Sequence, residues 1–232
     1  MSEDLRKFPS TPHLAWLGRE SVRDDKVLSP VEAKLFLAAP VVIEEKVDGA
    51  NLGISFTTSG SVRFQNRGHW LRGQLSGQWE RLRGWAAAHG LALREVLPAD
   101  HVLFGEWCYA KHSIPYDCLP DWFLAFDVYD CHAGRFWSSA RRNALAGAAG
   151  IATVPEIARG VFPLSDLQTM LDERSAVGHV PREGLYLRYE DADWLLARAK
   201  LVRAAFTQAI SEHWTRRGMI RNCQESAVTE SR

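Results

Sequence analysis

Residues 41–49 read Val-Val-Ile-Glu-Glu-Lys-Val-Asp-Gly, and the rest of the chain is best interpreted outward from this stretch. Its β-branched start predicts a buried strand that ends beside Lys46. A lysine at the rim of a sheet becomes a nucleophile when its pKa falls, and burial and neighbouring cations both lower that pKa. Gly49 would let the backbone approach a ligand closely. The Lys-x-Asp-Gly pattern fixes only three residues, so by itself it also fits a surface lysine in a turn.

On either side of this stretch the sequence predicts short strands mixed with helices. Ser29, Pro30 and Glu32 are typical of a helix start. Helices are expected over residues 29–39, 75–89 (ended by Gly90), 138–150, from 165 onward and 203–217. Strands are expected over 51–56, 62–65, 101–109 and 122–129, and as a hairpin of 184–189 with 194–200. Together these elements predict an α+β fold of mostly antiparallel sheets with helices on their outer faces.

Composition and charge narrow the class of protein. The chain has 232 residues, of which 46% are hydrophobic and 24% charged, and this excludes a disordered or low-complexity chain. Its 28 Lys and Arg residues balance 28 Asp and Glu residues, so contact with nucleic acid would need a local basic patch. No linker divides the chain, and we expect one domain over residues 1–232 with a frayed tail from Gln224.

The four cysteines show no CxxC spacing, which favours free thiols over a disulfide framework. With no apolar run long enough for a bilayer and no signal-peptide core, the sequence predicts a cytoplasmic protein without a membrane partner. His112 and Cys108 alone are too few for a closed zinc site.

Four more segments place polar residues at the end of an apolar strand. They are Asn66–Gly68, Phe104–Trp107, Glu183–Arg188 and Ala197–Lys200. In this order with residues 46–49, they resemble the covalent lysyl-nucleotidyltransferase superfamily of polynucleotide ligases and capping enzymes. Residues 105–116 with 123–130, together with the entry segment 11–14 and residues 198–206, resemble ATP-dependent RNA ligases of the RNA-repair and RNA-editing type. The resemblance covers about residues 8–215 and implies a nucleotidyltransferase (ATP-grasp-like ligase adenylation) domain.

The resemblance implies a role for each matching residue. Lys46 would attack the α-phosphate of ATP and carry AMP as a covalent intermediate, and Arg198 and Lys200 would join it as catalytic cations. Glu183 would hold Mg²⁺ or Mn²⁺. The remaining nucleotide-binding residues would be Glu45, Val47, Asp48, Asn51, Arg67, Glu106, Phe126 and Arg188.

Within that set the residues leave some alternatives open. Arg67 would bind phosphate through its bidentate fork, at the RNA 5′ end. Glu106 would accept hydrogen bonds from the ribose hydroxyls or else form a strand-end salt bridge. Phe126 would stack on adenine or else belong to the core. Backbone groups near Glu45 and Val47 would read the adenine edge.

The implied activity is sealing of an RNA 5′-phosphate to a 3′-hydroxyl end, after AMP transfer through Lys46. The family's larger members carry an OB-fold or helical domain that we do not expect here, so an end-healing kinase or phosphatase is an expected partner. The alternatives are a DNA ligase, a GTP-dependent capping-type nucleotidyltransferase, and a non-catalytic nucleotide- or RNA-binding module.

Overall fold

The computed structural model describes residues 5–18, 26–204 and 219–225, and its strands form two antiparallel sheets. The smaller sheet has the order β10-β9-β1-β8. Its strands are β1 (Val41–Lys46), β8 (Glu156–Gly160), β9 (Gly184–Glu190) and β10 (Leu195–Val202). The larger sheet has the order β4-β3-β2-β5-β6-β7. Its strands are β2 (Ala50–Phe56), β3 (Val62–Gln65), β4 (Trp70–Leu71), β5 (His101–Trp107), β6 (Phe123–Asp130) and β7 (Arg135–Phe136).

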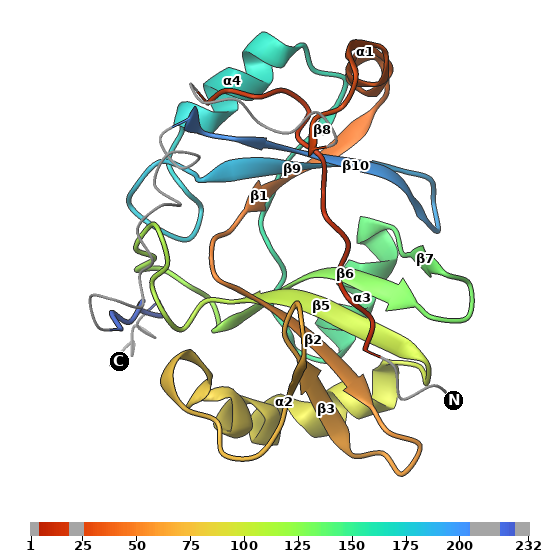
Figure 1. The fold of residues 1–232 in the computed structure, drawn as a ribbon, viewed down its shortest axis with the longest axis vertical. Helices are drawn as coiled ribbons and strands as arrows, with labels where there is room; N and C mark the ends of the chain where they lie inside the picture. Colours follow the sequence, from red (N-terminus) through yellow and green to blue (C-terminus); the bar gives the residue numbers. More distant parts are fainter. Residues whose placement is uncertain (1–4, 19–25, 205–218, 226–232) are drawn as a thin grey trace, which may run out of the picture.

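Helices cover the outer face of each sheet (Figure 1). Helices α1 (Pro30–Ala38) and α4 (Leu164–Asp172) lie on the smaller sheet, and α2 (Leu82–Val96) and α3 (Ser139–Ala148) lie on the larger one. Each sheet buries its own apolar cluster against its helices, around Ile43 in the smaller and Leu103 in the larger. The inner faces are therefore turned toward each other, and the predicted α+β architecture with outer helices is confirmed.

One link between the sheets is residues 47–49, which run from the end of β1 directly into β2 (Figure 1). The chain returns to the smaller sheet between α3 and β8. A further connection is the N-terminal segment. His13 forms parallel bridges with Lys200 and Val27, while the ring of Phe8 contacts Phe126 edge-on at 5.1 Å between centroids. The segment thus spans from the smaller sheet to the larger one.

The helix boundaries follow the local signals in most places. Ser29 and Glu32 form the predicted capping box of α1, and Ser138 caps α3. The prediction that Gly90 ends a helix was wrong, because α2 continues to Val96 and buries Leu93 on the same apolar face as Leu82 and Trp85. Packing of that face outweighs the propensity cost of a mid-helix glycine, about 1 kcal/mol.

Several further expectations have definite outcomes. Helix α4 begins one residue before Ser165, after Pro163, and without a side-chain cap. Strands β4, β7 and β8 were not predicted. The four cysteines are free, as expected. Most of the helix expected over 203–217 and of the tail lies outside the described residues.

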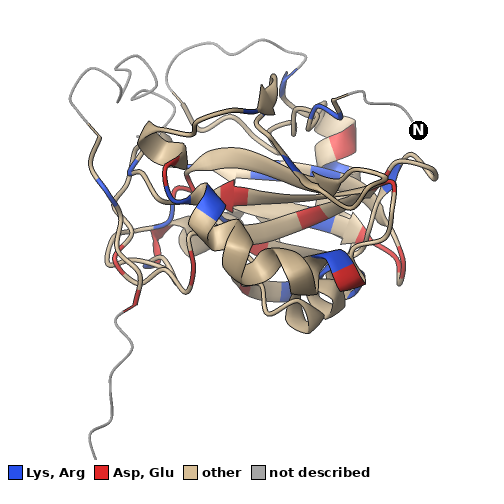
Figure 2. Ribbon diagram, turned by 90° about the horizontal axis from the view of Figure 1, so that it is seen from below, with Lys and Arg blue, Asp and Glu red and all other residues tan. Residues whose placement is uncertain are grey.

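Figure 2 shows basic and acidic residues interspersed along the ribbon, in keeping with the zero formal net charge. Among the described residues no helix has the length and apolar character needed to cross a membrane.

Candidate active site

The Lys-x-Asp-Gly stretch lies where the chain leaves one sheet and enters the other. Lys46 is the last residue of β1 and pairs with Gly184 on β9. Gly49 donates its backbone N–H to Glu106 Oε1 at 3.0 Å. A β-carbon at Gly49 would lie 2.6 Å from the Trp107 carbonyl oxygen, so a side chain there would force the two strands apart. The glycine lets β2 and β5 bring Glu106 next to Lys46.

Lys46 forms an ion pair with Glu183. Its Nζ lies 2.6 Å from Oε1 and 2.7 Å from Oε2 of that residue. Burial acts to lower the pKa of Lys46, but the carboxylates of Glu183, Asp48 and Glu106 outweigh it and raise the pKa. The sequence-based expectation that cations depress this pKa is therefore corrected for the ligand-free protein, since carboxylates surround the amine.

Acidic groups are in excess around this lysine. Burial, together with the charges of Asp48 and Glu183, raises the pKa of Glu106 to about 8 even though Lys46 opposes the shift. Burial and Asp48 also raise the pKa of Glu183. The cluster has more carboxylates than its lysine neutralises, which is an environment that favours an added cation.

Lys200 supplies positive charge on the other side of Lys46. Burial and the charge of Lys46 lower the pKa of Lys200 to about 8. His13 lies beside the two lysines, and burial, followed by the charges of Lys200 and Lys46, lowers its pKa to about 4. His13 therefore adds no positive charge beside the two lysines at physiological pH.

Asp48 is held by a loop that follows β5. Its Oδ2 accepts the Ser113 backbone N–H at 2.6 Å, and its own N–H donates to the Tyr116 hydroxyl at 2.8 Å. That loop is fixed in turn by Asn222, a buried residue from the far end of the chain. The Asn222 side chain accepts from Tyr116 N at 2.9 Å and donates to the Cys108 and Ala110 carbonyls at 2.8 and 3.2 Å.

Two hollows meet at Lys46. The first lies between the sheets, and its walls include Val47, Phe126, Val154, Tyr186 and Lys200, together with Phe8, Ser10 and Thr11 of the N-terminal segment. The second opens over Asp48, Gly49, Asn66, His69, Gln78 and Trp79. Lys46, Asn51, Arg67 and Glu106 line both.

The side-chain oxygen of Asn51 is a buried acceptor at this site. It has no hydrogen-bond partner among the residues that the structure describes, although Asn51 lines both hollows. A buried unsatisfied acceptor costs about 1–3 kcal/mol, so the site is built to receive a donor or a cation at this point.

Most of the predicted site residues come together here, and sequence reasoning missed several others. The missed residues are Phe8, Ser10, Val154, Tyr186, His69, Gln78, Ser113, Tyr116 and Asn222. Tyr116 and Ser113 had a signal, because both lie in the stretch 105–116 that carries the resemblance. Asn222 had none, since its contacts cross more than a hundred residues of sequence.

Glu45 and Phe126 occupy different settings. The backbone N–H of Glu45 donates to the Pro155 carbonyl, and its carboxylate accepts from Ser175 Oγ and from Ala176 N at 2.8 Å. This N–H is therefore already used by the fold.

Phe126 is half-buried. It packs against an apolar core cluster and also lines the first hollow.

The structure places Arg188 in the core and outside the two hollows. Its guanidinium is fully buried and bonds Asp127 Oδ1 at 2.5 Å, Glu190 Oε2 at 2.9 Å and the Trp137 carbonyl at 2.9 Å. This placement corrects the expectation that Arg188 surrounds a phosphate, because its donors are taken up by the protein.

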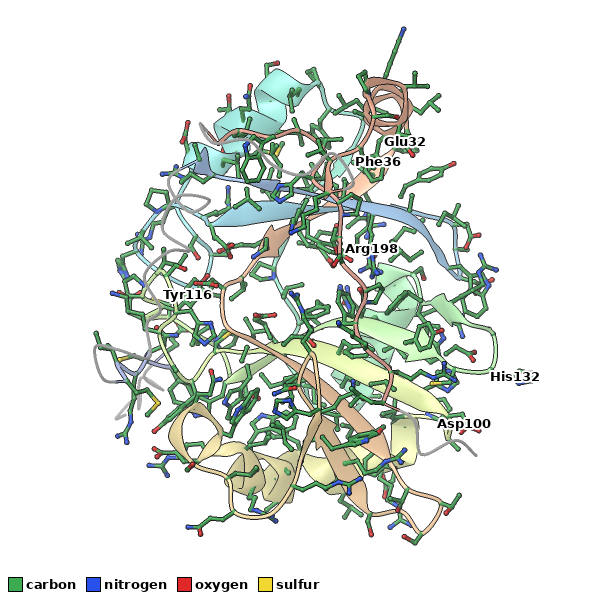
Figure 3. All side chains as sticks on the ribbon, viewed as in Figure 1. Glu32, Phe36, Asp100, Tyr116, His132 and Arg198 are labelled. Carbon is green, nitrogen blue, oxygen red and sulfur yellow. The ribbon has the colours of Figure 1, made fainter. Side chains whose placement is uncertain are left out.

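Arg198 also lies outside the walls of both hollows. Its guanidinium lies over the rings of Phe8 and Phe136, at 4.7 and 4.6 Å, and reaches Asp127 Oδ2 at 3.5 Å. Figure 3 shows Arg198 between the two sheets, near their inner faces. It holds the N-terminal segment against β7 and stays close to the first hollow.

Comparison with known proteins gives results in keeping with this geometry. The family model described as RNA ligase matches residues 39–202. No curated protein matches the chain.

Solved structures share the fold. A Naegleria gruberi RNA ligase variant with ATP and manganese superimposes with a TM-score of 0.63 at 15% identity, over 90% of this chain and 59% of that one. Another variant of that ligase, with AMP and manganese, gives a TM-score of 0.57 at 16% identity, over 75% and 53% of the two chains. The present chain spans between half and three fifths of the length of these relatives. Because the family model covers well over half of the sequence, the chain belongs to the RNA ligase family.

Proposed function

We propose that the protein is the catalytic core of an ATP-dependent RNA ligase that forms a covalent lysyl-AMP at Lys46. The observation that carries this proposal is the position of Lys46 at the meeting point of two hollows. A ligase nucleophile must reach a bound nucleotide from one side and deliver it to a nucleic-acid end on the other. A lysine that lines both spaces satisfies this requirement.

The first hollow suits the adenosine part of ATP. Phe126, Val47 and Val154 offer apolar contacts for the base, and Glu106 offers a carboxyl for the ribose hydroxyls. Lys200 lies at the same end as Lys46 and would neutralise the α-phosphate, with Arg198 behind it against Phe8. Lysine and arginine charges placed where negative charge develops stabilise the transition state of phosphoryl transfer.

The second hollow suits the 5′-phosphate of RNA. Arg67 lines both spaces and would bind that phosphate through its planar fork, while Asn66, His69 and Gln78 add polar groups around it. Trp79 offers a ring at the same rim.

The donor set fits a hard divalent cation. Glu183, Asp48 and the unpartnered oxygen of Asn51 are oxygen ligands near an excess of negative charge, and oxygen ligands are what Mg²⁺ and Mn²⁺ prefer. The relatives named above contain manganese with ATP or AMP. When bound, the ion would neutralise phosphate charge during transfer.

These positions support the following proposed reaction. The Lys46 ammonium separates from Glu183 and releases a proton to solvent. The neutral amine then attacks the α-phosphorus, the bond to the β-phosphate oxygen breaks, pyrophosphate leaves, and a second proton leaves the nitrogen to solvent. A phosphoramide bond now joins AMP to Nζ. An oxygen of the RNA 5′-phosphate next displaces the lysine, and a 3′-hydroxyl finally displaces AMP. We also propose that RNA with these ends is the substrate, that an end-healing kinase or phosphatase supplies it, and that the protein works in the cytoplasm.

Label transfer tests the first step. Protein stripped of AMP with pyrophosphate is incubated with Mg²⁺ and α-labelled ATP or GTP, then separated on a denaturing gel. We expect label from ATP, lost by at least about 10³-fold in Lys46→Ala because the nucleophile is gone. Lys34→Ala on the exposed face of α1 is the matched control and should keep the label.

Two results would overturn the proposal. Preference for GTP would indicate capping chemistry. If the folded protein takes up label from neither ATP nor GTP, it is a binding module without this activity.

A further inference from the structure

Three potential metal ligands converge on the surface away from both hollows. The ligand atoms of Asp117, Cys118 and His179 all lie within 4.8 Å of one another. His179 Nδ1 is 2.6 Å from the Asp117 carboxylate and 3.9 Å from Cys118 Sγ. Asp117 and Cys118 follow Tyr116 in the loop after β5, and His179 lies in the segment between α4 and β9.

The backbone holds these two segments together. Cys118 donates its N–H to the Val177 carbonyl at 3.2 Å. A β-carbon at Gly178 would come within 3.2 Å of the Pro115 carbonyl oxygen, so the two segments pass each other in close contact. The three side chains therefore project from a frame that is already formed without an ion.

We propose that Asp117, Cys118 and His179 bind a first-row divalent transition metal, zinc in first place. Imidazole nitrogen, thiolate sulfur and carboxylate oxygen are the ligand types of Zn²⁺, whereas the thiolate disfavours Mg²⁺ and Ca²⁺. On binding, the thiol proton leaves to solvent and the sulfur–metal bond forms. The proton that His179 Nδ1 donates to Asp117 is also released to solvent, and the imidazole keeps a proton on Nε2, so that Nδ1 can bind the metal. Three protein ligands leave one position of a tetrahedral ion for water.

The bound ion would connect two segments that support the site. The loop carrying Asp117 and Cys118 also holds Asp48, through Ser113 and Tyr116. The segment carrying His179 runs into Glu183, the partner of Lys46. None of the three proposed ligands is among the residues found to line the two hollows, so the ion would act on the support of the site.

Cobalt titration tests this site directly. Protein freed of metal is titrated with Co²⁺ and followed by the thiolate-to-cobalt absorption band, and Zn²⁺ is then added as competitor. We expect one Co²⁺ per chain, a band that Zn²⁺ abolishes, and affinity at least about tenfold weaker in Cys118→Ser and in His179→Ala. Cys131→Ser and His132→Ala are matched controls on a distant turn, and Figure 3 shows His132 at the opposite edge from Tyr116.

Several results would overturn the inference. The inference fails if the protein binds neither cobalt nor zinc, or if the thiolate-to-cobalt band survives in Cys118→Ser. It also fails if the control variants lose as much affinity as the ligand variants. Circular dichroism on each variant shows that the fold is retained, as expected for changes on the surface. Magnesium-supported label transfer to Lys46 is a separate readout, so failure of this site is distinguishable from failure of the proposed function.

Discussion

Arg188 and Lys46 are both cations surrounded by carboxylates, and the sequence places both near the end of an apolar strand. Arg188 is fully buried, and its nitrogens bond Asp127, Glu190 and the Phe126 and Trp137 carbonyls. Lys46 has 28% of its side chain exposed, and within the described part of the chain its amine bonds Glu183 alone.

The difference lies in how completely each cluster is balanced. Around Arg188, Arg142 pairs with Glu44 at 2.5 Å and Arg198 reaches Asp127 at 3.5 Å, so three arginines face the three acids Asp127, Glu190 and Glu44. Around Lys46, acids are in excess, the pKa of Glu106 rises to about 8, and the Asn51 oxygen has no partner in segments 5–18, 26–204 and 219–225. A balanced buried cluster fixes the two sheets together, whereas the unbalanced cluster at the hollows is arranged to receive ligand charge.

The largest expected effect is on stability, at Arg188. Arg188→Met leaves Asp127 and Glu190 buried without their cation, and we expect a loss of about 3–5 kcal/mol in the free energy of unfolding. Urea denaturation measures the change. Arg221→Met, which breaks an exposed pair with Glu80 at 2.9 Å, should cost less than about 1 kcal/mol. Equal losses in the two variants would contradict a structural role specific to the buried network.

A smaller effect is expected where the C-terminal segment supports Asp48. Asn222→Ala removes three buried hydrogen bonds and leaves their backbone partners unsatisfied, which should lower the free energy of unfolding by about 2–3 kcal/mol. At a temperature where the variant is folded, label transfer from ATP should also slow, because Ser113 and Tyr116 no longer fix Asp48. Gln74→Ala, which removes an exposed amide, is the control. Full label transfer by folded Asn222→Ala would show that Asp48 does not need this support.

The last prediction concerns pH. The folded-state pKa of Glu106 is raised to about 8, so the folded protein binds this proton more tightly than the unfolded chain. The stabilising contribution is present at acidic pH and is lost as pH rises through 8. Glu106→Gln should therefore flatten the decline of melting temperature between about pH 5 and 8. Glu95→Gln on the exposed face of α2 should leave the slope unchanged, and an unchanged slope in Glu106→Gln would contradict the raised pKa.

Local signals predicted those parts of the fold that depend on local chemistry. The capping box of Ser29 and Glu32 and the β-branched start of β1 act within a few residues, and both appear where expected. Gly90 was misread because the apolar face of α2 extends beyond it to Leu93. Strand β8 was missed because its residues, Glu156–Gly160, lack the alternation of a half-buried strand.

The site shows the same division. The motif order reflects strand ends that meet between two sheets, and most of the predicted residues therefore lie at the hollows. These are Lys46, Asp48, Asn51, Arg67, Glu106, Phe126 and Lys200, and Glu183 contacts Lys46. The sequence could not show that Arg188 turns into the core. An arginine near the end of a predicted strand has the same sequence pattern whether its side chain enters the core or faces a ligand. Nor could it bring His179 to Cys118 or Asn222 to Tyr116, because those contacts depend on the path of distant loops.

The most direct test of the account is to locate the nucleotide on the protein. Lys200 has the lower pKa, at about 8, so by pKa alone it would be the better nucleophile, yet it lines only the first hollow. After incubation with ATP and Mg²⁺, proteolysis and mass spectrometry identify the modified peptide. The account predicts an acid-labile AMP adduct on Lys46. An adduct on Lys200 or on any other residue would contradict it.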